Sequence, residues 1–331
     1  MISVYEEGVR MRSPLILLPP LMIFLLASCG SDEQPKSSKG EPGTEQPEAT
    51  TQAPPPKEGG AQLVTPAFTV PSGAEIFECM RVPFEIKEDL YVQSSAAWQA
   101  PGGHHMLIYY SEGSVVYKDE PHACDGTDML DVRLIGVGGA DGVGIAMPPG
   151  VTLKIPAGAK IYGQSHYVNT TSKDITAKDT INLELLPFEK VENVAGTWAE
   201  INSTFELKPH ETSTVSVTCS PPEAGKVPWI IPHMHEYGKH ITIEHIVDNV
   251  TNVLYDSDWG EALREHFPLT MFAEHLSIKP TDKFRTTCTW DNTTPGSILW
   301  PKEMCVAFMA YYPSSSGALW ACDADGSNFT P

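Results

Sequence analysis

The sequence predicts an all-β fold divided between two domains, and three observations support this. The chain has 331 residues, which exceeds the length of one typical domain. Its 29 prolines and 26 glycines favour turns and short strands over long helices. From Gln62 onward, short runs alternate apolar and polar residues, as half-buried antiparallel strands do, and turn residues separate these runs.

Individual strands follow from this alternation. We expect strands over 151–156, 160–168 and 180–186, and a second block that opens with a strand over 213–219. The boundary is placed near Ala195-Gly196, so the first domain covers 62–195 and the second covers 196–331. One helix is expected over 258–267, where Trp259, Ala262, Leu263 and His266 have helical spacing.

The first residues have the features of an export signal. Arg10 and Arg12 precede an apolar run over 15–26 that is too short to span a bilayer. The run ends in Leu-Ala-Ser-Cys29, which resembles the lipobox at which bacterial lipoproteins are cleaved and acylated on the cysteine. We therefore expect a signal peptide over 1–29 and an exported protein that a lipid on Cys29 anchors in the bacterial cell envelope, in the outer membrane of a diderm host. A hydrophobic anchor with an incidental cysteine is the alternative.

Residues 30–61 are rich in Pro, Glu, Gln, Ser, Thr and Gly without periodic apolar positions, which predicts a disordered tether. The formal net charge of −20 would repel a nucleic-acid backbone and anionic lipid, so no nucleic-acid partner is expected and membrane contact is limited to the lipid. Without Cys29, six cysteines remain, which in an exported chain predicts three disulfides among 15 possible pairings.

Histidines in the first predicted domain are candidate metal ligands. His104 and His105 follow two glycines and precede an apolar strand. Neighbouring strand residues point to opposite faces, so both imidazoles reach one metal only if the backbone bends there, which the glycines permit. His166, on the strand over 160–168, becomes a candidate ligand only as a third imidazole beside His104 and His105. Each motif alone is more typical of surface or core histidines.

A second candidate set lies in the second domain. His233 and His235 are two residues apart, which places them on one face of an extended strand. Met304 would add a thioether, and two imidazoles with a thioether form a soft set suited to Cu(I) rather than zinc. The remaining histidines of this region are interpreted as structural or without a role: His210, His240, His245, His266 and His275.

The order of these motifs resembles one family. The chain carries HHM, then QSHY, then HMH followed by Gly238, then EMC with a downstream YYP, and the segment over 279–290 fits the strand before the ligand methionine. This pattern, over about 77–322, resembles the copper type II, ascorbate-dependent monooxygenases, which include peptidylglycine α-hydroxylating monooxygenase and dopamine β-monooxygenase. The chain would be a bacterial lipoprotein member.

The resemblance implies two tandem jelly-roll-like β-sandwich domains that each bind one copper. His104, His105 and His166 would hold an electron-transfer copper, with Gln164 matching a glutamine of the amidating enzyme. His233, His235 and Met304 would hold the copper where O2 and a small organic substrate react, with ascorbate or a similar reductant as co-substrate. The implied disulfides are Cys79 with Cys124, Cys219 with Cys322, and Cys288 with Cys305.

Three positions depart from the peptide-amidating members. Those enzymes bind the substrate carboxylate with an arginine, an asparagine and a tyrosine, where this chain has Ile231, Val306 and Phe308. None of these supplies a hydrogen bond to a carboxylate, so we expect a neutral or aromatic substrate. The alternative function is a non-catalytic lipoprotein that stores or delivers copper through the same ligands. A zinc hydrolase is disfavoured because no His-Glu pair has metalloprotease spacing.

Overall fold

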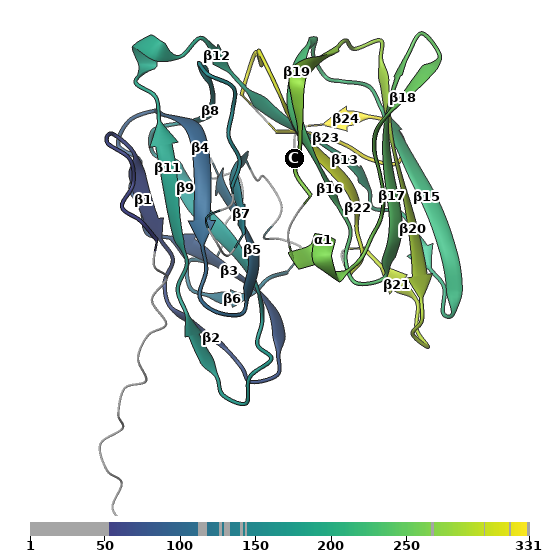
Figure 1. Cartoon of the computed structure of the whole chain (residues 1–331), viewed down its shortest axis with the longest axis horizontal. Helices are drawn as coiled ribbons and strands as arrows, with labels where there is room; N and C mark the ends of the chain where they lie inside the picture. The colour runs from purple at the N-terminus through teal and green to yellow at the C-terminus, as the bar shows by residue number, and fades with distance from the viewer. Residues whose placement is uncertain are drawn as a thin grey trace, which may run out of the picture. The chain divides into compact units, whose positions relative to one another are not determined.

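The computed structural model describes residues 53–111, 118–125, 128, 133–139, 142, 144–265, 268–300, 302–317 and 319–329. Cys29, the signal peptide and most of the predicted tether lie outside these residues. The described part of the chain belongs to one compact unit. It is nearly all β, with one short α-helix, which confirms the all-β part of the predicted fold class (Figure 1). Within it, no helix is long and apolar enough to cross a membrane.

Two five-stranded sheets form the first half of this unit. One has the order β1-β11-β4-β8-β12 and the other β6-β3-β9-β5-β7, and β2 pairs with β10. The strands are β1 (Ala61–Val64), β2 (Phe68–Val70), β3 (Glu75–Val82), β4 (Leu90–Trp98), β5 (Gly103–Ser111), β6 (His122–Ala123), β7 (Arg133–Gly139), β8 (Val151–Ile155), β9 (Lys160–Val168), β10 (Ile175–Ala177), β11 (Thr180–Leu185) and β12 (Asn193–Val194), with a short 3-10 helix at Phe188–Lys190. Buried aliphatic side chains such as Val92, Ile108, Leu153 and Ile161 form its core.

A six-stranded and a four-stranded sheet form the second half. Their orders are β19-β16-β22-β13-β23-β24 and β15-β20-β17-β18, and β14 pairs with β21. The elements are β13 (Gly196–Asn202), β14 (Glu206–Leu207), β15 (Glu211–Cys219), β16 (Gly225–His233), β17 (Gly238–Val247), β18 (Val250–Asp258), α1 (Glu261–Glu265), β19 (Thr270–Ile278), β20 (Lys283–Asn292), β21 (Ile298–Leu299), β22 (Cys305–Tyr311), β23 (Leu319–Cys322) and β24 (Asn328–Phe329). Trp198, Ile243, Phe284 and Met309 belong to a buried core cluster here.

No sheet of the described residues combines strands from before and after Ala195, which lies between β12 and β13. Buried side chains nevertheless continue from one half to the other, because Trp229, Ile231 and Ala310 belong to the same apolar cluster as the first-half core. The two halves therefore share buried surface.

The expected strands over 151–156, 160–168, 180–186 and 213–219 correspond to β8, β9, β11 and β15. The helix is shorter than expected: α1 begins at Glu261 because Asp258 still pairs with His240 as part of β18 and the Trp259 N–H donates to Lys239. Residues 266 and 267, the predicted end of the helix, lie outside the described part.

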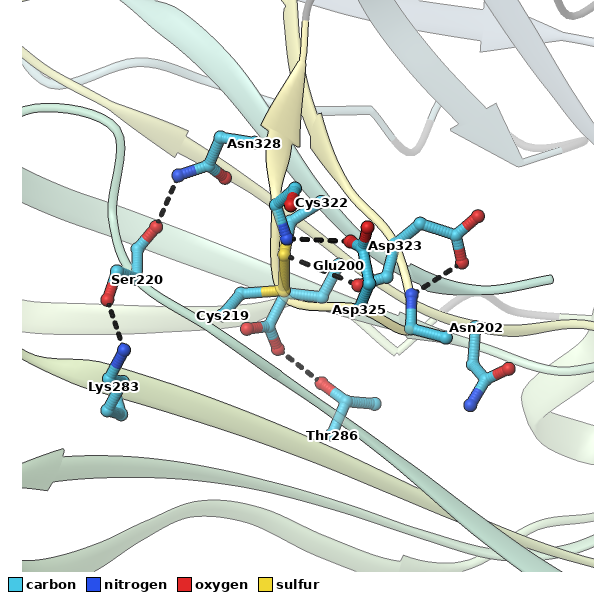
Figure 2. The surroundings of a disulfide bond; sticks show 12 residues. Glu200, Asn202, Cys219, Ser220, Lys283, Thr286, Cys322, Asp323, Asp325 and Asn328 are labelled. Atoms are coloured by element: carbon cyan, nitrogen blue, oxygen red, sulfur yellow. Dashed lines mark hydrogen bonds between the residues drawn. A yellow bond between two sulfur atoms is a disulfide. The ribbon is translucent and has the colours of Figure 1, made fainter. Parts of the chain in front are cut away.

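Three disulfides join Cys79 to Cys124, Cys219 to Cys322 and Cys288 to Cys305. These are the pairs that the family resemblance implies. Cys219–Cys322 ties β15 to β23 beside the buried Glu200, as Figure 2 shows. Cys288–Cys305 lies at the start of β22, directly after Met304.

Candidate metal centre

The first set of predicted ligands lies where β5 pairs with β9. The register shifts between Gly103 and His105, so His104 is the extra residue of a bulge, and His105 lies opposite His166. Gly102 has a φ of 89°, a conformation that favours glycine. The His104 and His105 rings lie 5.0 and 4.8 Å from the His166 ring. The backbone bend that the glycines permit is therefore present in the structure.

Side chains of β3 hold His166 in place. Its Nε2 lies 2.9 Å from Glu75 Oε1, and its ring stacks on Phe77 with centroids 4.1 Å apart. Since a carboxylate accepts the Nε2 proton, the lone pair of neutral His166 is on Nδ1. That Nδ1 lies 3.5 Å from His105 Nδ1, so two nitrogens of this set converge.

Two imidazoles of this set, His105 and His166, are neutral at physiological pH. Desolvation, followed by repulsion from neighbouring histidines, lowers the pKa of His105 and of His166 to about 3. The backbone of Arg264 in α1 also hydrogen-bonds the His105 ring. A neutral imidazole is the form that ligates a metal.

The second set differs from its prediction in one respect. β16 ends at His233, and His235 lies in the turn that follows, so the two residues do not share an extended strand as expected. The turn nevertheless brings His233 Nε2 within 3.0 Å of His235 Nε2. Because His235 Nδ1 donates to the Lys302 carbonyl at 3.0 Å, the His235 lone pair is on Nε2 and faces His233. Desolvation lowers the pKa of His233 well below its ordinary value.

Glu303 fixes this turn and was not identified from the sequence. It is fully buried and accepts hydrogen bonds from the backbone N–H of His235 at 3.1 Å, the backbone N–H of Tyr237 at 2.6 Å and the Trp290 indole at 2.8 Å. The only sequence signal was its position directly before Met304. Gly238 completes the turn, because a Cβ there would lie 2.5 Å from the Trp259 side chain.

Met304 follows the two residues that bond His235. Its side chain packs on an apolar cluster that includes Val306 and Phe308 of β22. Val306 lies opposite His233, and Phe308 lies opposite Ile231. The three positions that depart from the amidating enzymes therefore lie beside His233 on β16 and β22. The Phe308 ring lies 6.3 Å from His233. The surroundings of the second set are thus apolar.

The two histidine sets lie near each other in the described unit. The Phe77 ring, stacked on His166, also lies 6.1 Å from the His235 ring. Among the described His, Cys, Asp and Glu residues, the one group of three whose ligand atoms all lie within 4.8 Å of one another is Cys79, Cys124 and Asp128. The structure therefore brings the predicted histidine ligands together as pairs, His105–His166 and His233–His235.

The remaining candidates have local partners. Gln164 donates to Cys79 Sγ at 3.8 Å. His245 is buried and lies 3.1 Å from Asp282, and His240 lies between Asp256 and Asp258, which agrees with a structural role for both. His275 hydrogen-bonds the Tyr312 hydroxyl, and His210 lies in a turn. His266 is outside the described residues.

Comparison with known proteins finds a family match in the second half. Residues 202–329 match the family model for the C-terminal domain of the copper type II ascorbate-dependent monooxygenases. No curated protein matches the sequence. Solved structures with some similarity include an allantoicase from Saccharomyces cerevisiae (9% identity, 71% of this chain and 77% of that chain covered, TM-score 0.23) and a structure of the infectious bursal disease virus Gx strain (8% identity, 78% and 73% covered, TM-score 0.20). Neither score supports an argument about fold or function.

Proposed function

This chain belongs to the copper type II ascorbate-dependent monooxygenase family, and we propose that it hydroxylates a C–H bond of a small organic substrate with O2 and an ascorbate-like reductant. The observation that carries the proposal is the pair of converging nitrogens in each half of the described unit. In the second half this pair is His233 and His235, and the His235 ring hydrogen-bonds the Lys302 carbonyl of the segment that carries Met304.

The donor sets fit copper. Imidazole nitrogens suit both oxidation states of copper, and a thioether favours Cu(I). His104, His105 and His166 would hold one copper, and His233, His235 and Met304 would hold the other. Copper in these sites would supply one-electron redox chemistry and the binding of O2.

The chain's own residues prepare these sites. Glu75 sets the tautomer of His166, and the Lys302 carbonyl sets that of His235, so each ring would have its other nitrogen free to bind a metal. Glu303 holds the turn that carries His235 against the segment that carries Met304. Val306 and Ile231 are buried, and with the partly buried Phe308 they make the surroundings of the second site apolar, which would suit an apolar substrate.

Copper analysis and product analysis together test this function. We expect two coppers per chain and a hydroxylated product that forms only with O2 and ascorbate. Met304→Ala should abolish turnover while sparing the first-half site, and His166→Ala should impair electron delivery while sparing the second. Full copper loading without any hydroxylated product from a broad substrate panel would instead favour the non-catalytic copper lipoprotein.

We also propose that a lipid on Cys29 tethers the enzyme to the cell envelope, on the strength of the Leu-Ala-Ser-Cys motif and the polar segment after it. Metabolic labelling with a fatty acid should mark the wild-type protein and leave Cys29→Ser unlabelled. Equal labelling of both proteins would contradict the tether.

A further inference from the structure

A cysteine-containing cluster lies apart from the predicted copper ligands. Cys79 of β3 lies opposite His122 of β6, and Cys124 follows two residues after His122. The backbone N–H of Cys124 continues this pairing by donating to Phe77. His122 and Cys124 therefore lie on one face of the edge segment, next to Cys79.

Asp128 completes the cluster. One of its carboxylate oxygens lies 3.0 Å from His122 Nε2, and the other accepts the backbone N–H of Asp125 at 2.7 Å. The Asp128 side chain is 3% exposed, and that of His122 is 15% exposed. A ligand oxygen of Asp128 and both sulfurs lie within 4.8 Å of one another.

The cysteines are joined as a disulfide, which does not bind a cation as thiolates do. A disulfide gains little from a buried carboxylate beside it, because its sulfurs are at most weak hydrogen-bond acceptors. Two thiolates, in contrast, form with a carboxylate a donor set that zinc accepts, and three protein ligands leave a fourth position for water. His122 would orient the carboxylate, as second partners of metal ligands do.

This disulfide is also the most accessible of the three. Cys124 is half-buried, whereas the four cysteines of the other two disulfides have no exposed surface. Thiol–disulfide exchange requires access to a sulfur atom. A dithiol reductant should therefore open Cys79–Cys124 before it opens the pairs within the second half.

We propose that the Cys79–Cys124 disulfide conceals a zinc site that reduction creates, with Cys79, Cys124 and Asp128 as ligands and His122 as the group that orients Asp128. A dithiol supplies two electrons and two protons to break the S–S bond and becomes a disulfide itself. Binding of Zn2+ then releases the two thiol protons. The site does not depend on the proposed function, because it uses none of the predicted copper ligands.

Cobalt provides the test, because thiolate ligands give Co2+ an intense charge-transfer band that imidazole ligands do not. The full chain would be reduced with a phosphine, freed of it by anaerobic gel filtration, and titrated with Co2+ beside the oxidised protein. Alkylation mapping would show which cysteines opened. We expect reduction to add labels on Cys79 and Cys124 alone, one additional Co2+ per chain, a thiolate band absent from the oxidised protein, and loss of that band on addition of Zn2+.

Two aspartates in the same turn provide a matched pair of variants. Asp128→Asn should weaken Co2+ binding by about ten- to a hundredfold, whereas Asp125→Asn, at an exposed carboxylate paired with Lys118, should leave it unchanged. A Cys79→Ser variant, which removes one thiolate, should lose the additional Co2+. The proposal is overturned if oxidised and reduced protein bind Co2+ alike, if the buried disulfides open first, or if Asp128→Asn binds as the wild type does.

Discussion

A single buried carboxylate, Glu303, connects the two chain segments that carry the second ligand set. It bonds the backbone of His235 and lies next to Met304 in the sequence, and the Trp290 indole from β20 holds its position. Hydrogen bonds to a charged acceptor are worth more than neutral ones, and burial increases the cost of losing them.

We predict that Glu303→Gln weakens copper binding at His233, His235 and Met304 by about ten- to a hundredfold and lowers the free energy of unfolding by about 2–3 kcal/mol. An amide has one acceptor oxygen and two donor hydrogens, so it cannot accept all three N–H groups. Competition titration with a copper chelator and denaturant unfolding would measure the two effects. The control is Glu236→Gln, at an exposed neighbour. A Glu303→Gln variant with unchanged copper affinity would contradict this role.

A second buried carboxylate, Glu200, makes stability depend on pH. Glu200 lies on β13 inside the second half and is fully buried, and Figure 2 shows its hydrogen bond with Thr286, at 2.6 Å. Its other oxygen has no hydrogen-bond partner among the described residues. Desolvation raises the pKa of Glu200 from 4.5 to about 8.

Because the folded pKa exceeds the unfolded one, the native state holds the proton more tightly. The stability that protonation confers is present below pH 4.5 and is lost as pH rises to about 8. We predict that the unfolding free energy of wild type relative to Glu200→Gln falls by up to about 1.4 kcal/mol per pH unit in this window and is constant above it. Denaturant titrations of both proteins across the window would measure this. Parallel pH profiles would show that Glu200 does not titrate as predicted.

At the scale of elements, one loop motif follows a strand in each half. Asn169 after β9 and Asn292 at the end of β20 both begin Asn-Thr-Thr, and both are buried. The Asn292 amide donates to the carbonyls of Leu207, Lys208 and Gly296, and its Oδ1 accepts the N–H and hydroxyl of Thr294. Asn169 makes the corresponding set with Val70, Pro71, Lys173 and Thr171. One side chain thus closes each loop.

We predict that Asn292→Ala lowers the free energy of unfolding by about 2–4 kcal/mol, because it leaves the buried Leu207 carbonyl and two partly buried carbonyls without their donor. Asn252→Ala, at an exposed position in β18, should change it by less than about 0.5 kcal/mol. Urea unfolding of the two variants beside the wild type would measure both. Equal stability of the two variants would mean that the loop closes without its asparagine.

At the scale of the whole molecule, we expect substrate selection to depend on apolar side chains from neighbouring strands. Ile231 of β16 lies opposite Phe308 of β22, and Val306 lies opposite His233. None of these side chains can pair with a substrate carboxylate. The first half contributes Leu107, Tyr109 and Tyr162 to the apolar cluster that contains Val306 and Phe308.

We predict that copper-loaded protein with ascorbate prefers a neutral aromatic C–H substrate to a glycine-extended peptide by about two orders of magnitude or more, since a lost charge-assisted pair costs about 2–5 kcal/mol. Direct competition, followed by mass spectrometry, would measure the preference. Ile231→Arg should reduce this preference, because the arginine can pair with the peptide carboxylate. Efficient hydroxylation of the peptide by the wild type would overturn this view of the pocket.

The sequence by itself determined the all-β class, named the candidate donor residues and showed that glycines permit a bend at His104, because each follows from local alternation, side-chain chemistry or glycine placement. The tertiary structure decided which ring nitrogen of His166 and His235 is free, through Glu75 and the Lys302 carbonyl, which lie far from them in the chain. It also decided that His235 leaves the strand, since Glu303 binds the turn, and that Asp128 lies beside Cys79 and Cys124. Such contacts join residues that periodicity does not relate, so they become visible only when the sheets have formed.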